Sequence, residues 1–140
     1  FVLYRGNASA KLAMNARYGV GEFYDGGYRR SYAWGPTFRP NARLNVSMTL
    51  QVNDISLPAA SYVSTQPTVR LNYNFNTRVF LNALLQYNTD THQLNSNVRF
   101  NVIHHPLSDL FFVYNERRDE RRGLMQDRAL IAKFTQMLAF

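Results

Sequence analysis

The sequence contains no cysteine, very little lysine, and no apolar stretch long enough to form a transmembrane helix. The absence of cysteine excludes disulfide frameworks, zinc–thiolate centres and thiol nucleophiles. A helix that crosses a bilayer needs about 20 mostly apolar residues, and the mean hydropathy of −0.34 is slightly polar. Hydropathy averages nevertheless miss β-barrel strands, because alternating apolar and polar residues cancel within a window. A helical membrane span is therefore excluded, whereas a membrane barrel is not.

Acidic residues are also scarce: 9 of them stand against 16 basic residues, which gives a net charge of +7. Such a balance suits an anionic partner. Single-stranded nucleic acid is bound by basic and aromatic side chains interleaved on one face, but here the two kinds alternate to opposite faces, so we expect no nucleic-acid partner. With 140 residues the chain is one domain. Because Phe1–Arg5 resembles the end of a strand, we expect residues 1–140 to be the C-terminal portion of a longer, N-terminally truncated barrel.

Apolar and polar residues alternate with a period of two along most of the chain, which is typical of β-strands with two different faces. Within 43–53, for example, every even position is apolar and every odd position is polar. The same pattern recurs in 64–75, 78–87, 97–103 and 130–140, and more weakly in 11–24 and 28–38. The segment 110–115 is apolar on both faces. This pattern predicts about eight strands with no helix between them.

The connections between these strands predict an antiparallel meander. Arg39–Ala42 and Phe75–Arg78 are rich in turn-forming residues and predict tight turns. We expect longer loops at Asp54–Tyr62, Asn88–Asn95 and Glu116–Arg128. Short turns on one side and long loops on the other are typical of outer-membrane barrels. The predicted fold is all-β: an antiparallel up-and-down transmembrane β-barrel of about eight strands that forms part of a larger barrel.

Alternation alone does not tell whether the apolar faces meet lipid or a protein core. A soluble β-barrel that binds a hydrophobic ligand has the same period. The polar face, however, carries cations with almost no acids, and aromatic residues gather near strand ends, as they do at membrane interfaces. We therefore predict lipid-facing apolar surfaces. The predicted lumen-lining residues are Arg17, Arg43, Arg70, Arg78, Arg99 and Lys133, and the predicted aromatic girdle comprises Tyr18, Trp34, Phe38, Tyr73, Phe75, Tyr87 and Tyr114.

The end of the chain resembles the C-terminal strand signal of bacterial outer-membrane proteins, because Phe140 follows Phe134 and Leu138 at alternate positions. That resemblance implies recognition of Phe140 by the barrel-assembly machinery and a periplasmic C-terminus. Several further segments carry a second resemblance: Gly21–Gly26, Leu71–Phe75, Leu85–Asn88, Asn97–Phe100 and Asp109–Asn115. They resemble the C-terminal barrel of bacterial outer-membrane proteins of unknown function that carry an N-terminal family 9 carbohydrate-binding-like domain. Leu107 stands where that family usually has glycine.

Two polar clusters invite a chemical interpretation. His104, His105, Ser108 and Asp109 contain the residue types of a hydrolase triad, but one predicted turn, Ile103–Asp109, cannot make them converge as a triad requires. The histidine pair also lacks a nearby third metal ligand. We therefore predict no catalytic, cofactor or metal site. The charged run 116–122 predicts a solvated loop or, alternatively, contacts with lipopolysaccharide phosphates through bidentate guanidinium groups.

The cations of the polar face indicate function most directly. Unpaired charges are costly to bury, and an eight-stranded barrel has an interior just wide enough for side chains. The polar face therefore predicts a wider barrel with a hydrated lumen in the bacterial outer membrane. We expect this barrel to act as a channel favouring anionic solutes or as a membrane anchor. Its predicted partners are the lipid bilayer, lipopolysaccharide and the assembly machinery. The alternatives are an outer-membrane hydrolase or surface carbohydrate-processing protein whose active part lies outside this chain, and the soluble ligand-binding barrel.

Overall fold

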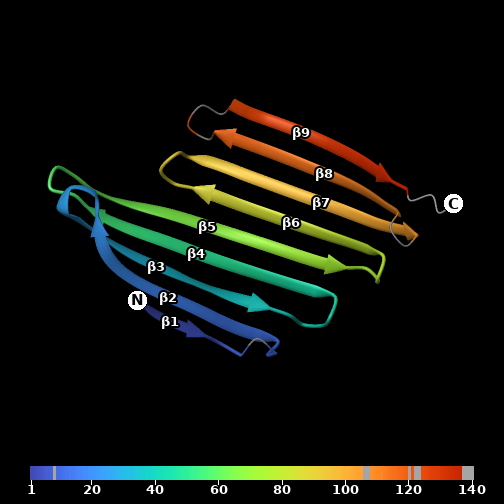
Figure 1. Cartoon of the computed structure of the whole chain (residues 1–140), viewed down its shortest axis with the longest axis horizontal. Helices are drawn as coiled ribbons and strands as arrows, with labels where there is room; N and C mark the ends of the chain where they lie inside the picture. The colour runs from blue at the N-terminus through green and yellow to red at the C-terminus, as the bar shows by residue number, and fades with distance from the viewer. Residues whose placement is uncertain (8, 106–107, 120, 122–123, 137–140) are drawn as a thin grey trace.

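The computed structural model describes residues 1–7, 9–105, 108–119, 121 and 124–136 (Figure 1). They form one antiparallel sheet in which each strand pairs with its neighbours in the sequence, so the predicted all-β meander is confirmed. The sheet has nine strands, because the first residues pair as a short strand of their own. The 3-10 turn η1 (Tyr24–Gly26) lies between the second and third strands. The strands are β1 (Val2–Arg5), β2 (Leu12–Phe23), β3 (Gly27–Phe38), β4 (Leu44–Ser56), β5 (Ser61–Asn74), β6 (Val79–Asn88), β7 (Gln93–His105), β8 (Ser108–Asp119) and β9 (Leu124–Thr135).

The strand ends form two rims. The connections after β1, β3, β5 and β7 lie at one end of the sheet, rim A, and those after β2, β4, β6 and β8 lie at the other, rim B (Figure 1). Among the described residues, none of the helical segments has the length and apolarity to cross a membrane.

The sheet has an apolar face and a polar face, because the alternation stays in phase across every strand pair. Residues opposite each other in neighbouring strands point to the same side. One row on the apolar face consists of Leu12, Phe38, Val46, Leu71, Ala83, Val98, Tyr114 and Leu130. The neighbouring row on the polar face consists of Ala13, Thr37, Ser47, Arg70, Leu84, Asn97, Asn115 and Ala129.

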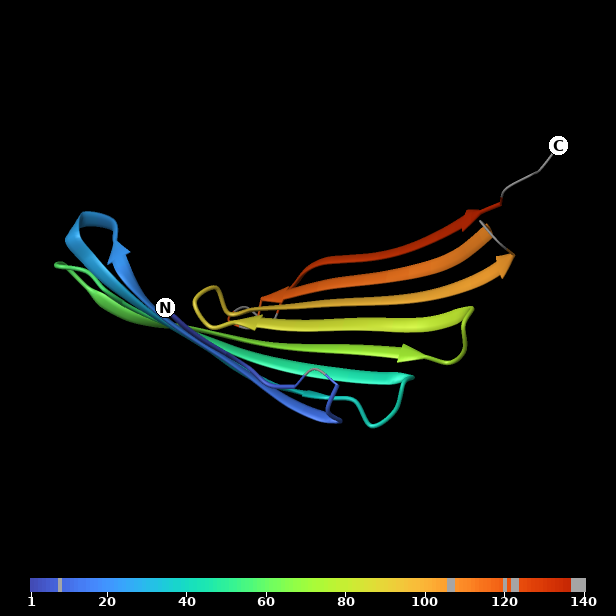
Figure 2. The ribbon, with the colours of Figure 1, turned by 60° about the horizontal axis from the view of Figure 1, so that its bottom comes forward.

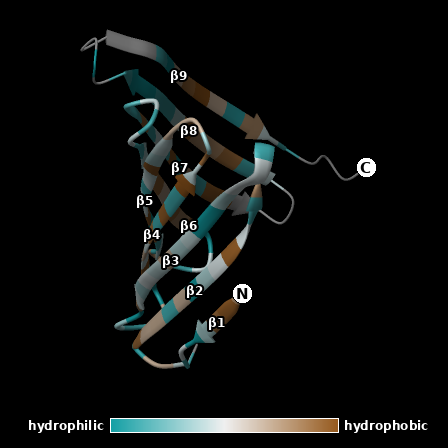
Figure 3. Ribbon diagram, turned by 90° about the vertical axis from the view of Figure 1, so that its left-hand side faces the viewer, coloured by the Kyte–Doolittle hydropathy of each residue, from teal (hydrophilic) through white to brown (hydrophobic). Residues whose placement is uncertain are grey.

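The described residues form a single curved layer (Figure 2, Figure 3). No large side chain among them is fully buried, and the few enclosed residues are mostly small. Four of these, Ala13, Thr37, Ile55 and Val113, point to the polar face, which shows that this face is the more enclosed one. Soluble domains bury their apolar faces between two layers. Here the apolar face is uncovered.

The strands are staggered along the sheet. Phe38 ends β3 at rim A, yet its row reaches Leu130, which lies five residues before the end of β9 at the same rim. In addition, β5 pairs with β6 only through Thr68–Asn74, so the β2–β3 and β4–β5 hairpins project beyond the β6–β7 hairpin (Figure 2). Stagger of this kind is the geometric condition for strands that tilt around a barrel axis.

Two turns at rim A confirm the sequence prediction. The long loops predicted at the other end of the sheet are wrong, because the strands extend into them. At rim A the connections span residues 39–43 and 75–78. At rim B the strands continue into the expected loops, which leaves connections of only 57–60, 89–92 and 120–123. Facing partners extend these strands: Glu116 lies opposite Arg128 and Arg117 opposite Asp127. Polar residues at rim B were thus mistaken for loop residues.

The predicted turn Ile103–Asp109 is also too long. β7 continues through His104 to His105, and β8 already begins at Ser108, with a register shift between Ile103 and His105. His104 and His105, predicted to lie in this turn, therefore belong to a strand. Backbone pairing between His105 and Ser108 accounts for the difference.

Glycine at position 35 allows β3 and β4 to approach closely. A Cβ atom added there would lie 1.8 Å from the Met48 carbonyl oxygen, which no side chain tolerates. At Gly21 on the neighbouring strand, an added Cβ would meet nothing within 4 Å. The middle of the β3–β4 pair therefore depends on one glycine.

Candidate functional site

The polar face is the candidate functional surface. From β2 to β7 its described residues include no Asp or Glu, and the polar positions hold amides, hydroxyls and arginines. The described acidic side chains on this face are Asp109, Asp119 and Asp127, all near the ends of β8 and β9. The central part of the face therefore carries positive charge without a facing carboxylate.

The structure brings four of the six predicted lumen cations onto the polar face. Arg17 lies on β2, Arg70 on β5, Arg99 on β7 and Lys133 on β9, and their pairing partners all belong to the polar face. The four side chains are exposed to solvent. The Lys133 Nζ atom lies 5.8 Å from the centre of the Phe111 ring on the same face.

Arg43 and Arg78 lie in turns at rim A rather than in strands. Each arginine stands two positions after an asparagine whose side chain closes the turn. Asn41 Oδ1 accepts hydrogen bonds from the backbone N–H groups of Arg43 and Leu44, both at 2.9 Å. Asn76 Oδ1 accepts equivalent bonds from Arg78 at 2.8 Å and Val79 at 2.9 Å. The two exposed arginines thus occupy equivalent positions at one rim.

Further arginines of the polar face, among them Arg5 and Arg29, were missed from the sequence. Arg29 lies near the start of β3, where the predicted alternation is weak, and it pairs with Gly21 and Ile55. Arg5 lies in β1 opposite Asn15. Both side chains are exposed. Extending the alternation of β3 back from Ser31 would have placed Arg29 on the polar face.

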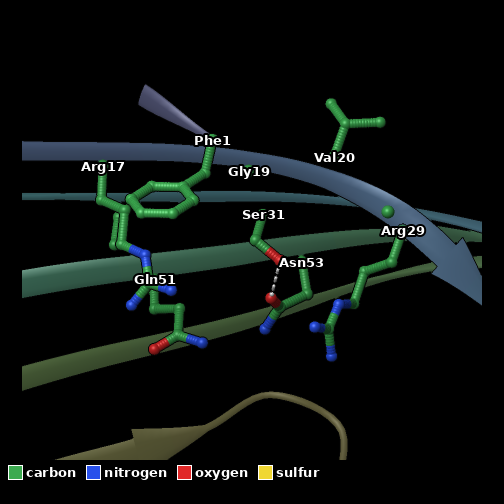
Figure 4. A pocket seen from close by; sticks show the side chains of 10 residues that line it. Phe1, Arg17, Gly19, Val20, Arg29, Ser31, Gln51 and Asn53 are labelled. Atoms are coloured by element: carbon green, nitrogen blue, oxygen red, sulfur yellow. Dashed lines mark hydrogen bonds between the residues drawn. The ribbon is translucent and has the colours of Figure 1, made fainter. Parts of the chain in front are cut away.

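The polar face is hollowed near rim B of β2, β3 and β4 (Figure 4). The hollow encloses about 360 Å³. Glycines at 19 and 21 provide no side chains to fill it, and Arg17 and Arg29 lie on its two sides. Between them, Ser31 Oγ donates a hydrogen bond of 2.9 Å to Asn53 Oδ1.

Aromatic rings contact both arginines of this hollow. The Arg17 guanidinium lies 5.7 Å from the centre of the Phe1 ring, and the Arg29 guanidinium lies 5.6 Å from that of Phe23. Such contacts leave guanidinium N–H groups at the ring edge free to bind an acceptor.

Six of the seven predicted girdle residues point to the apolar face from strands, and the ring of the seventh, Phe75, packs against Tyr73 and Phe100 of the same face. Phe38 and Tyr73 lie at rim A and Tyr87 near rim B, whereas Tyr18, Trp34 and Tyr114 lie farther from the strand ends. Phe75 occupies the β5–β6 turn, with its ring 4.6 Å from that of Tyr73. More of the predicted girdle residues thus lie at rim A than at rim B.

Charged residues on the apolar face gather near rim B. Glu116 of β8, whose side chain is 15% exposed, holds three neighbours: the Tyr114 hydroxyl donates to it, Arg118 Nη2 lies 3.0 Å from Oε1, and Arg128 Nη2 lies 3.7 Å from Oε2. The other described charges on this face lie within a few residues of the same rim, namely Glu22, Arg30 and Asp54.

No described residues form a group of three or more metal-ligating side chains. Ser108 is buried, and the predicted assembly residue Phe140 lies outside the described residues.

Comparison of the chain with protein-family models, curated proteins and solved structures gives no match.

Proposed function

We propose that this chain forms part of the wall of a bacterial outer-membrane β-barrel whose cationic lumen admits anions. The observation that carries the proposal is the uncovered apolar face. Large hydrophobic side chains such as Leu12, Met48 and Phe112 are 40–65% exposed on it. Exposed apolar surface costs about 25 cal/mol per Å² in water, so this face needs an apolar environment, and lipid supplies one.

The apolar face has dimensions that suit a bilayer. Strands β2 to β9 contain 10 to 14 residues each, whereas a tilted membrane strand needs about 9–11. On β4 the apolar positions run from Leu44 to Val52, which is about 26 Å along the strand. At a tilt of about 40° this corresponds to a height of about 20 Å, close to the roughly 25 Å apolar band of membrane barrels.

The edges of this apolar band resemble membrane interfaces. Charged groups appear on the apolar face only near rim B within the described strands, and Phe38 and Tyr73 mark rim A. In this arrangement rim A is periplasmic and rim B is extracellular. The resemblance of the terminal segment with Phe140 to the assembly signal supports the same orientation. Arg118 and Arg128 then lie where lipopolysaccharide phosphates are found.

The polar face supports a hydrated lumen. Several arginines share it without facing carboxylates, and such charges require water. Cationic linings attract anions and repel cations. We infer that a complete barrel containing this wall prefers anions, with a preference that fades at high salt as the Debye length shrinks to about 3 Å at 1 M.

Reversal potentials across planar bilayers test this function. Replacing Arg70 and Arg99 with Gln in the complete barrel is expected to lower its anion preference severalfold at low salt while leaving its folding intact, since both side chains are exposed. The matched control is Arg30→Gln with Arg118→Gln, which removes the same charge from the apolar face. A cation-selective barrel, or equal effects of the two double variants, would refute the lumen assignment.

A further inference from the structure

The strongest remaining feature of the molecule is the hollow on the polar face of β2, β3 and β4. Its residues form a grid of three rows by strand register: Arg17 with Ala33 and Gln51, Gly19 with Ser31 and Asn53, and Gly21 with Arg29 and Ile55. The first and last rows each contain one cation, and the middle row contains only neutral groups. A surface that merely attracts anions does not require two cations separated by a row of neutral groups.

The two guanidinium groups are kept apart. Arg17 faces Ala33, and Arg29 lies four residues from Ala33 along β3. Four residues of a strand span about 13 Å. Each guanidinium also rests beside its own aromatic ring, Phe1 for Arg17 and Phe23 for Arg29, which restricts its movement toward the other. A single small anion can therefore be held closely by one of them, but not by both.

The middle of the hollow offers neutral hydrogen-bonding groups. The Ser31 hydroxyl donates to Asn53 Oδ1, which leaves the amide N–H groups of Asn53 as donors, and Gln51 lies between Asn53 and Arg17 (Figure 4). Gly19, which faces Ser31, and Gly21, which faces Arg29, have no side chains to fill this space. An extended solute with a charge at each end matches these groups better than a compact ion.

We propose that this hollow is a binding site for a small organic dianion, with Arg17 and Arg29 each binding one terminal carboxylate and Asn53 and Gln51 contacting the chain between them. Arginine binds a carboxylate through two parallel N–H···O bonds, and holding both ends at once raises affinity through effective concentration. The inference rests on the proposed function, because a solute can reach the hollow only if the polar face meets water.

The test is calorimetric titration of the complete barrel that contains this chain, in detergent micelles, with acetate, succinate, adipate and suberate at fixed ionic strength. We expect one of the longer dicarboxylates to bind at least about tenfold more tightly than acetate, and Arg17→Gln or Arg29→Gln to abolish this advantage. Arg70→Gln is the matched control, because Arg70 is exposed on the same face but does not line the hollow.

The variants Arg17→Lys and Arg29→Lys keep the charge but lose the bidentate geometry, and they are expected to retain only part of the advantage. Affinity that does not depend on ligand length, or an equal loss in Arg70→Gln, would show diffuse attraction only and overturn the site. Bilayer selectivity is measured separately, so an anion-selective barrel without dicarboxylate binding would overturn this site and leave the proposed function intact.

Discussion

Arginine provides 14 of the 16 basic side chains, and its chemistry determines how the polar face is used. The guanidinium group stays charged at any physiological pH, is weakly hydrated and presents five N–H donors. On the polar face these groups have water and neutral amides as neighbours, because the carboxylates of the central strands lie on the other face. Asn41 and Asn76 hold the backbone of two more arginines at rim A through equivalent side-chain hydrogen bonds. The positive charge therefore extends from the sheet to its rim.

Gly35→Ala is predicted to destabilise the fold strongly. The added methyl group would collide with the Met48 backbone, which can move only by separating β3 from β4. We expect a loss of about 3 kcal/mol in unfolding free energy, measured by reversible denaturant unfolding in detergent. Gly21→Ala is the control, because its methyl group has open space, and a comparable loss in both variants would show that general strand effects of glycine are responsible.

At the level of strands, the hairpins at rim B extend farther than their sequences suggest. Charged residues normally indicate loops, but across β8 and β9 they face opposite charges, and Glu116 contacts both Arg118 and Arg128. The strands therefore continue to within four residues of each other. Within the described part of the chain, the connections at rim B are accordingly short.

Glu116→Gln is predicted to loosen the rim B end of the β8–β9 hairpin. The amide keeps the shape of the side chain but removes the charge that two guanidinium groups share, and these then repel each other. We expect faster hydrogen exchange at the backbone amides of Ala129 and Ile131 in β9. Asp127→Asn serves for comparison, because its ion pair with Arg117 is long, at 3.9 Å, and exposed. Similar exchange in both variants would contradict this role of Glu116.

The sequence predicts the faces of the strands well and their ends poorly. Alternation at 43–53 correctly places Leu44 and Val46 on one face and Asn45 and Ser47 on the other, since a strand has a fixed side-chain period. Strand ends depend on cross-strand pairs such as Ser56 with Ser61, which local composition does not encode. The hollow is unpredictable from one strand, because it combines residues of three.

At the level of the whole molecule, the proposed function depends on the environment of the apolar face. The described sheet is one layer with staggered strands, and its edges are β1 and β9. A layer without a core gains its stability only when something apolar covers one side. The proposed anion preference, the proposed dianion site and the proposed contact of Arg118 with phosphate all require lipid on that side and water on the other.

Single-cysteine accessibility along β4 tests this central claim most directly, and the absence of native cysteine makes it clean. Cysteines replace Val46, Met48 and Leu50 of the apolar face and Ser47, Thr49 and Gln51 of the polar face, one at a time, in protein reconstituted into vesicles. We predict that a water-soluble thiol reagent modifies the polar set and that probes on the apolar set are quenched by brominated lipid. Aqueous labelling of both sets, or lipid quenching of the polar set, would contradict the account.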